Sequence, residues 1–441
     1  MNILAEVLLY LWPFAVLGLH IVFKPEQAAV LAYVAGWVWL PLITIDIPGL
    51  PPYGKFTATS IGMIPCMLIF GLTQIAALRP SWADIPILLW IIAPLPSSLT
   101  NGLGLSDGLS GAAKHFLEYG IPYFAGRIYL RDEREWIFLS KAIACCALFY
   151  LPLCLFEMRM SPTLHQFIFG YVGRSSFETN SLFGPLKWAP TVFMNSAFEV
   201  SMLMVIATLV VFVQLRRAPT QDFIFCKPIW FAVIMFAAVV LCKKWSGLGM
   251  LGFGVVTLTL SELLKSRIWA ITLVLVPVSY MVVFTLGVWR LEGVSDVIAR
   301  VSPRRAESFQ YRIDNDSRLV DKAMQRPSFG WGGWGRSRIY DETGKDISVT
   351  DSAYGIYLGN FGLFGLISCG LLYVLPFLAF LYRNPIENWL VGNAIYVTPF
   401  AMVVALHTVD NLFNAFPGVV YPFFAGGVSA FAHQPSSKKE R

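Results

Sequence analysis

Residues 352–381 read SAYGIYLGNFGLFGLISCGLLYVLPFLAFL and contain no Asp, Glu, Lys or Arg. This run is longer than the roughly 20 apolar residues that an α-helix needs to cross the hydrocarbon of a bilayer. The rest of the chain is similar, because 56% of its 441 residues are apolar and only 14% are charged. Soluble globular proteins are rarely so poor in charge. The sequence therefore predicts a membrane protein.

Apolar runs of comparable length recur along nearly the whole chain. We predict spans at residues 3–22, 27–45, 56–78, 84–97, 112–130, 136–156, 190–214, 226–242, 247–263, 268–289, 352–381, 391–408 and 415–431. The fourth is short and rich in proline, which predicts a kinked or re-entrant segment. No positively charged leader precedes the first run, so we expect it to be retained. The predicted fold is an all-α polytopic membrane protein with about 12–13 transmembrane helices.

Cysteine and charge usage limit the classes of partner. All seven cysteines lie in or beside apolar runs, and their spacing favours neither a disulfide framework nor a zinc site. The net charge of +6 is ordinary for a membrane protein. We expect membrane lipids as neighbours, no nucleic acid, no metal and no cofactor.

Basic residues predict the orientation, because short loops kept inside the cell carry the excess of Lys and Arg. Alternate loops, leaving out the longest one, hold fourteen and seven basic residues. The richer set includes the C-terminal tail, which we therefore place in the cytoplasm. Two polar segments, near 157–189 and at 290–350, then face outward.

This orientation gives four predicted regions. Residues 1–289 hold ten transmembrane helices with the outer loop near 157–189, and residues 290–350 form a large extracytoplasmic loop with helical segments. Residues 351–431 return to the membrane, and residues 432–441 form a cytoplasmic tail. Within the loop, Ser302 is a plausible N-cap, Pro303 suits a first helical turn and Pro327 ends the helix.

The loop contains a literal G-x-G-x-x-G, formed by Gly330, Gly332 and Gly335, with Asp351 some way downstream. A dinucleotide-binding fingerprint requires a preceding strand, a following helix and a βαβ unit. The preceding segment reads as a helix instead, with Phe309, Ile313, Val320 and Met324 on one apolar stripe. We therefore do not expect a nucleotide site.

The order of features resembles the O-antigen ligase and polymerase superfamily. Many apolar runs are followed by a late outer loop with an Arg-bearing helix, then by RPSFGWGGWG at 326–335, then by TDSAYGIYLGNFGLFGLI at 350–367 entering a span. FEMRMSPTLHQFIFG, PTVFMNSAFEV and DNLFNAFPG are similar to a subgroup of exopolysaccharide-type members.

The resemblance implies a bacterial inner-membrane glycosyltransferase with its active site on the periplasmic side. It would move a glycan from an undecaprenyl-pyrophosphate carrier to a hydroxyl of a glycan, lipid or other acceptor, with inversion and without a metal. Other envelope polysaccharide assembly proteins are possible partners. In ligases the segment after the Gly-rich turn typically begins with His-Asn, whereas this chain has Asp351 and Ser352. No catalytic His is therefore carried over.

Transfer from a pyrophosphate carrier needs cations for the leaving group and a base for the acceptor hydroxyl. Lys243 and Lys244 lie in a short outer turn at the place where ligases carry a pyrophosphate-binding basic residue; alternatively they are lysines at the membrane boundary. Arg312 fits best the Arg that the family pattern places before the Gly-rich turn, so we predict that it is catalytic. Asp351 is the predicted base, and it is also a good helix N-cap.

Further residues are weaker candidates. We predict pyrophosphate contacts for Arg318 and Arg336, although Arg318 suits a local ion pair with Asp314 equally well. Backbone N–H groups of the Gly-rich turn also suit an anion-binding nest. Four residues are candidates for the acceptor site or cavity, two buried acids and two loop tryptophans: Glu199, Asp410, Trp331 and Trp334.

A transporter or flippase of lipid-linked glycans, without chemistry, is the alternative function. Secondary transporters are usually built from repeated halves. This chain shows no internal repeat and has a single large outer loop late in the sequence, so transfer chemistry is the favoured prediction.

Overall fold

The computed structural model describes residues 2–47, 51–171, 186–300, 302–390, 394–415 and 418–433. Part of the predicted outer loop near 157–189, from 172 to 185, lies outside the described residues. The predicted tail is also outside from residue 434 onward.

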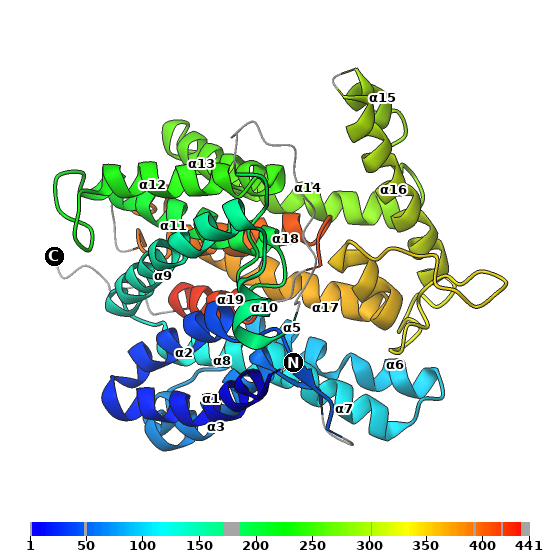
Figure 1. The fold of residues 1–441 in the computed structure, drawn as a ribbon, viewed down its shortest axis with the longest axis horizontal. Helices are drawn as coiled ribbons and strands as arrows, with labels where there is room; N and C mark the ends of the chain where they lie inside the picture. The colour runs from blue at the N-terminus through cyan, green and yellow to red at the C-terminus, as the bar shows by residue number, and fades with distance from the viewer. Residues whose placement is uncertain are drawn as a thin grey trace.

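The regular secondary structure of the described residues is almost entirely helical (Figure 1). The helices of the first half are α1 (Ile3–Val22), α2 (Pro25–Trp39), α3 (Lys55–Phe70), α4 (Leu72–Ala76), η1 (Trp82–Asp84), α5 (Ile85–Ile92), α6 (Pro94–Thr100), α7 (Leu105–His115), η2 (Phe116–Gly120), α8 (Ile121–Tyr129), α9 (Glu133–Met160), α10 (Leu164–Phe169) and α11 (Ala197–Arg217). Those of the second half are α12 (Pro228–Leu241), α13 (Trp245–Leu263), α14 (Ile268–Thr285), α15 (Val294–Ala299), α16 (Pro303–Ala323), α17 (Ala353–Arg383), η3 (Ile386–Asn388), α18 (Thr398–Asp410) and α19 (Val420–Ala432).

Seven helical segments of the described chain are long and apolar enough to cross a membrane. They are α1, the η1–α6 series Trp82–Thr100, α9, α11, α13, α14 and α17. Shorter apolar helices, among them α3, α12 and α19, pack beside them. Every predicted apolar run contains at least one helix, and the proline-rich fourth run is indeed divided into consecutive short helices. The prediction of an all-α, multi-pass membrane protein is confirmed at this level.

Burial separates central from peripheral helices. α11, α18 and α19 are buried along nearly their whole length. α1, α12 and α14 instead expose large apolar side chains such as Ile3, Trp230 and Val276. We expect these exposed apolar side chains to face lipid, because apolar surface is unfavourable in water. The helical backbone tolerates lipid because its N–H and C=O groups are satisfied within the helix.

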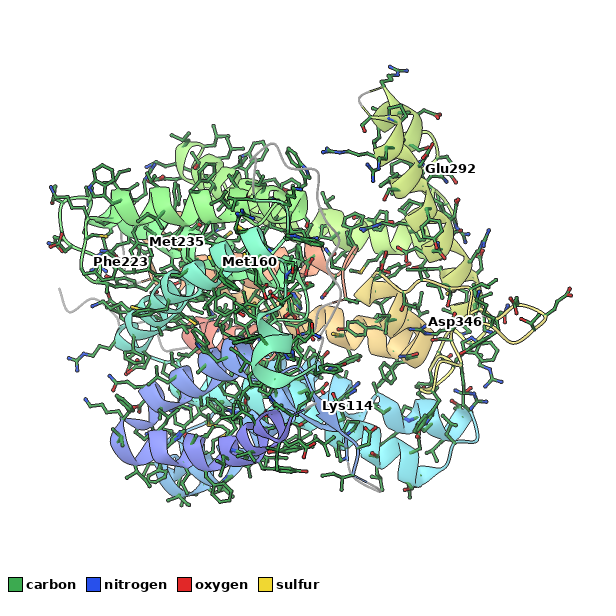
Figure 2. The ribbon with its side chains drawn as sticks, viewed as in Figure 1. Lys114, Met160, Phe223, Met235, Glu292 and Asp346 are labelled. Carbon is green, nitrogen blue, oxygen red and sulfur yellow. The ribbon has the colours of Figure 1, made fainter. Side chains whose placement is uncertain are left out.

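The predicted loop helix is present as α16 and projects with α15 as an arm from the helical body (Figure 1). In Figure 2, Glu292 lies on this arm, Asp346 lies in the loop that follows α16, and Phe223 and Met235 lie on the body. The apolar stripe of α16 docks through Ile313 and Val320 onto Phe284, Tyr354 and Leu358 of α14 and α17. The arm is thus held at its base by a small apolar cluster of its own.

In the described ranges, the only strands are β1 (Thr44–Ile45) and β2 (Tyr53–Gly54), two residues each, which pair antiparallel. The G-x-G-x-x-G string follows α16 and has no strand before it. The Gly-rich turn packs instead on a break in α17. There Gly362 has a φ of 64°, and Leu363 N donates to the Pro327 carbonyl at 2.7 Å.

Close contact between α8 and α19 gives a stability prediction. A Cβ added at Gly426 would lie 1.9 Å from the carbonyl oxygen of Tyr123, a backbone atom that cannot rotate away. We expect Gly426→Ala to lower the free energy of unfolding by about 1–3 kcal/mol or more. Gly370→Ala in α17, where nothing lies within 4 Å, is the matched control and should be neutral or slightly stabilising. Apparent Tm in detergent measures both; equal values would contradict this packing.

Candidate functional site

One pocket of about 680 Å³ lies where the arm meets the helical body. Its walls come from residues 191–198 at the start of α11, from the start of α13, from α16, from the residues before α17 and from the turn after α18. Three predicted residues, Lys244, Arg312 and Asp351, line it together. These residues are far apart in sequence, and only the packing of the arm brings them to one place.

Arg312 and Asp351 form a loose ion pair. The Arg312 Nε lies 3.7 Å from the Asp351 Oδ2, and the two side chains are 51% and 40% exposed. A partly exposed pair of this kind contributes little to stability. Both groups are therefore free to exchange this contact for a ligand in the pocket.

Lys244 and Lys243 have different environments although they are adjacent. Lys244 lines the pocket, and burial, reinforced by the positive charge of Arg312, lowers the pKa of its ammonium group. Lys243 has a φ of 56° and donates to the carbonyl of Leu186. Lys243 is not among the residues that line the pocket, so the predicted lysine pair separates into one pocket residue and one loop contact.

Asp316 is a pocket residue whose role the sequence did not predict. It lies one turn beyond Arg312 on α16, is 7% exposed and accepts a hydrogen bond from Ser352 Oγ at 3.0 Å. The same Ser352 oxygen accepts from Gly355 N and caps α17. Burial raises the pKa of Asp316 to about 6; the Asp351 carboxylate adds to this, while the Ser352 hydrogen bond and Arg312 oppose it. The four-residue spacing from Arg312 was the available signal.

Glu199 and Asp410 do not line the pocket but contact residues that do. The Glu199 carboxylate accepts from the backbone and side-chain nitrogens of Asn195 at 2.9 and 3.0 Å. Asp410 accepts from Asn414 Nδ2 at 2.7 Å, and the Asn414 carbonyl accepts from Ala353 N. Each predicted acid therefore orients an asparagine that lines the pocket.

Residues 191–195 form an irregular wall that buried side chains hold in place. Glu157 accepts from the N–H groups of Thr191 and Val192, both at 2.8 Å. The Phe193 N–H donates to Tyr150 Oη, and the Phe193 carbonyl accepts from Lys55 Nζ at 3.3 Å. We call this segment, residues 191–195, the pocket wall.

The remaining predicted residues lie outside the pocket. Arg318 is an exposed residue of α16 that does not line it. Arg336 donates to the Asn101 carbonyl at 3.0 Å, and Trp334 donates to Asp107 Oδ1 at 2.8 Å. Trp331 donates to the Lys322 carbonyl at 2.8 Å. Arg336, a predicted pyrophosphate contact, does not line the pocket with Arg312 and Asp351, because Arg336 and Trp334 tie the loop to Asn101 and to α7.

The first three N–H groups of the Gly-rich turn are not available for the expected anion nest. The N–H groups of Gly330, Trp331 and Gly332 donate to the carbonyls of Arg326, Gly359 and Asn360 at 2.9–3.0 Å. Backbone donors that are already used in this way are not available to a phosphate.

Comparison with known proteins leaves the chain without an assigned family: no family model and no curated protein matches it. Within the described residues, no group of three or more His, Cys, Asp or Glu side chains is arranged to hold a metal ion.

Asp316 gives a pH prediction. Because its folded-state pKa is about 6 against an ordinary value of 3.8, its favourable contribution to stability is full below about pH 4 and is lost as the pH rises through about 6. We expect Asp316→Asn to become progressively more stable relative to wild type over that range, by up to about 3 kcal/mol. Apparent Tm against pH measures the difference. A difference that stays constant with pH would contradict the buried carboxyl.

Proposed function

We propose that this protein transfers a glycan from an undecaprenyl-pyrophosphate carrier to an acceptor hydroxyl at the periplasmic face of a bacterial inner membrane. The observation that supports this best is the shared pocket of Lys244, Arg312 and Asp351. Two cations and one carboxylate are the groups that departure of pyrophosphate and activation of a hydroxyl require. The resemblance of the loop to glycan ligases and polymerases leads to the same reaction.

The donor fits the distribution of charged and apolar groups around the pocket. Lys244 is the N-cap of α13, a candidate spanning helix, and Met250 and Phe253 follow about two turns further along it. A pyrophosphate beside Lys244 and Arg312 would therefore leave its isoprenoid chain next to apolar side chains that enter the membrane. The pocket therefore has charged groups for the pyrophosphate and apolar groups for the start of the isoprenoid chain.

The proposed reaction needs one base and no covalent intermediate. Asp351 takes the proton of the acceptor hydroxyl as its oxygen attacks the anomeric carbon of the donor sugar. The bond between that carbon and the pyrophosphate oxygen breaks on the opposite side, which inverts the configuration. Lys244 and Arg312 stabilise the negative charge on the departing undecaprenyl pyrophosphate, and Asp351 later releases the proton to water. This proposal contains no metal step.

Asp316 supports this chemistry from a buried position. Its contact with Ser352 links the Arg-bearing face of α16 to the residue that follows Asp351. Its carboxyl is engaged and nearly inaccessible, so we assign the base role to the more exposed Asp351 and a positioning role to Asp316.

The adjacent lysines provide a matched test. We expect Lys244→Ala to lower glycan transfer by about 100-fold, the usual scale for loss of one group that stabilises a departing charge. Lys243→Ala should transfer nearly normally, because Lys243 contacts Leu186 and not the pocket. The ratio of surface glycan to lipid-linked glycan in complemented deletion cells measures transfer, with membrane levels of each variant as the control. Equal activity of the two variants would refute this assignment, as would normal glycan made by Asp351→Asn.

The deletion strain itself distinguishes the two forms of the reaction. Loss of long chains with single units retained identifies a polymerase. Accumulation of long lipid-linked chains identifies a ligase. Normal amounts and lengths of both would contradict glycan transfer altogether.

A further inference from the structure

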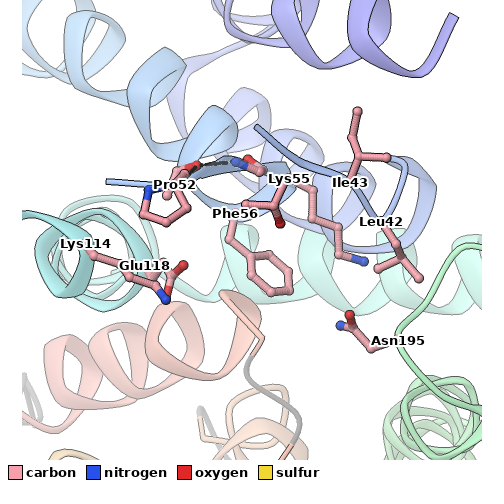
Figure 3. A pocket seen from close by; sticks show the side chains of 11 residues that line it. Leu42, Ile43, Pro52, Lys55, Phe56, Lys114, Glu118 and Asn195 are labelled. Carbon is pink, nitrogen blue, oxygen red and sulfur yellow. Dashed lines mark hydrogen bonds between the residues drawn. The ribbon is translucent and has the colours of Figure 1, made fainter. Parts of the chain in front are cut away.

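A second, smaller pocket of about 160 Å³ lies beside the first and shares Asn195 with it. Figure 3 shows Lys55 and Asn195 on one side of this pocket, Lys114 and Glu118 on the other, and the ring of Phe56 between them. We call it the lysine pocket. Its residues come from the β1–β2 hairpin, the start of α3, α7 with η2, and the pocket wall.

Lys55 is a buried ammonium with neutral partners. It is 4% exposed and donates to the carbonyls of Trp37 at 3.1 Å and Phe193 at 3.3 Å. An ammonium group has three N–H donors, so one remains for the pocket that Lys55 lines. Burying a charge is costly unless it is paired. The Lys55 Nζ also lies over the Phe56 ring, 5.2 Å from its centre. An anion in the pocket would pair with this ammonium group and favour its charged form.

The charges that line the pocket leave an excess of one positive charge. Lys114 and Glu118 are one helical turn apart, and across the described residues neither has an oppositely charged atom within 4.0 Å. Two ammonium groups therefore face one carboxylate. Glu199 offsets part of the Lys55 charge from behind Asn195, but it is not a lining residue.

We propose that the lysine pocket binds one acidic sugar residue of the glycan, such as a uronic acid, next to the sugar that reacts in the main pocket. The Phe56 ring offers a face to the C–H groups of the sugar, and Lys55 and Lys114 bind its carboxylate. Asn195, oriented by Glu199, contacts both pockets and so lies between neighbouring sugars. This inference rests on the proposed glycan transfer, and its test does not require transfer.

The test measures binding of two probes to the full-length protein in nanodiscs. Methyl β-glucuronide and methyl β-glucoside differ chiefly in the carboxylate, and ligand-observed NMR titration gives both affinities. We expect the glucuronide to bind at least about ten-fold more tightly, because a charge-assisted hydrogen bond is typically worth 1.5–3 kcal/mol. Equal affinities, or no binding of either probe, would overturn the proposal.

Two substitutions with opposite expected effects separate recognition from structure. Lys114→Gln should weaken glucuronide binding several-fold, whereas Glu118→Gln should strengthen it by removing a like charge. Lys141→Gln, at an exposed position of α9, is the control and should change nothing. Lys55 is left intact, since its loss would also strand two buried carbonyls. Changes of the same sign in Lys114→Gln and Glu118→Gln would reject the electrostatic account.

The two proposals fail in different ways. Asp351→Asn should keep glucuronide binding while losing transfer. Retained binding with normal transfer in that variant would refute the catalytic assignment and leave the lysine pocket standing. If the wild-type protein showed no selectivity for the glucuronide while Asp351→Asn lost transfer, the lysine pocket would be refuted and the catalytic assignment would stand.

Discussion

The pocket wall, residues 191–195, is irregular backbone within an apolar helical body, and its polar groups must be satisfied there. Each unsatisfied N–H or C=O would cost several kcal/mol in such surroundings. Glu157, Tyr150, Lys55 and Glu199 supply the partners. Because these four side chains come from three different helices, the wall fixes where α3, α9 and α11 meet. Both pockets depend on that junction.

The main pocket is completed from the other side by one turn of α16. Arg312 and Asp316 share that turn: the first contacts Asp351, and the second accepts from Ser352. Two residues of the arm thus contact the two adjacent residues that precede α17, Asp351 and Ser352. The accessible pair carries exchangeable charge, whereas the buried pair fixes the geometry. The Asp351 carboxylate therefore stays available to a ligand. The Asp316 carboxyl is buried, and this burial raises its pKa.

The sequence predicted the parts that depend on local pattern. Apolar runs located the helices, and Ser302, Pro303 and Pro327 located α16, because hydropathy and capping act over a few residues. Lys244, Arg312 and Asp351 were predicted from the family resemblance and from the chemistry that their residue types allow. Whether they share a pocket could not be predicted, since it depends on how the arm packs on α14 and α17.

The placement of the loop residues depends on tertiary packing in the same way. Arg336 and Trp334 were expected near the chemistry because they adjoin the Gly-rich turn, yet they contact Asn101 and α7, some 230 positions away in sequence. The lysine pocket was overlooked for a related reason. Lys114 and Glu118 are one helical turn apart, and nothing in their spacing indicates that Lys55 and Asn195 lie opposite.

The loop is fastened to α17 mainly through main-chain atoms. Leu363 N and Phe364 N donate to the carbonyls of Pro327 and Ser328, and Trp331 N and Gly332 N donate back to α17. Such docking does not depend on which side chains the loop carries. Most substitutions within residues 327–332 would therefore leave these contacts to α17 in place. Gly330, and Gly362 on the α17 side, are the exceptions, since a Cβ at either would collide with the facing backbone at 2.5–2.6 Å.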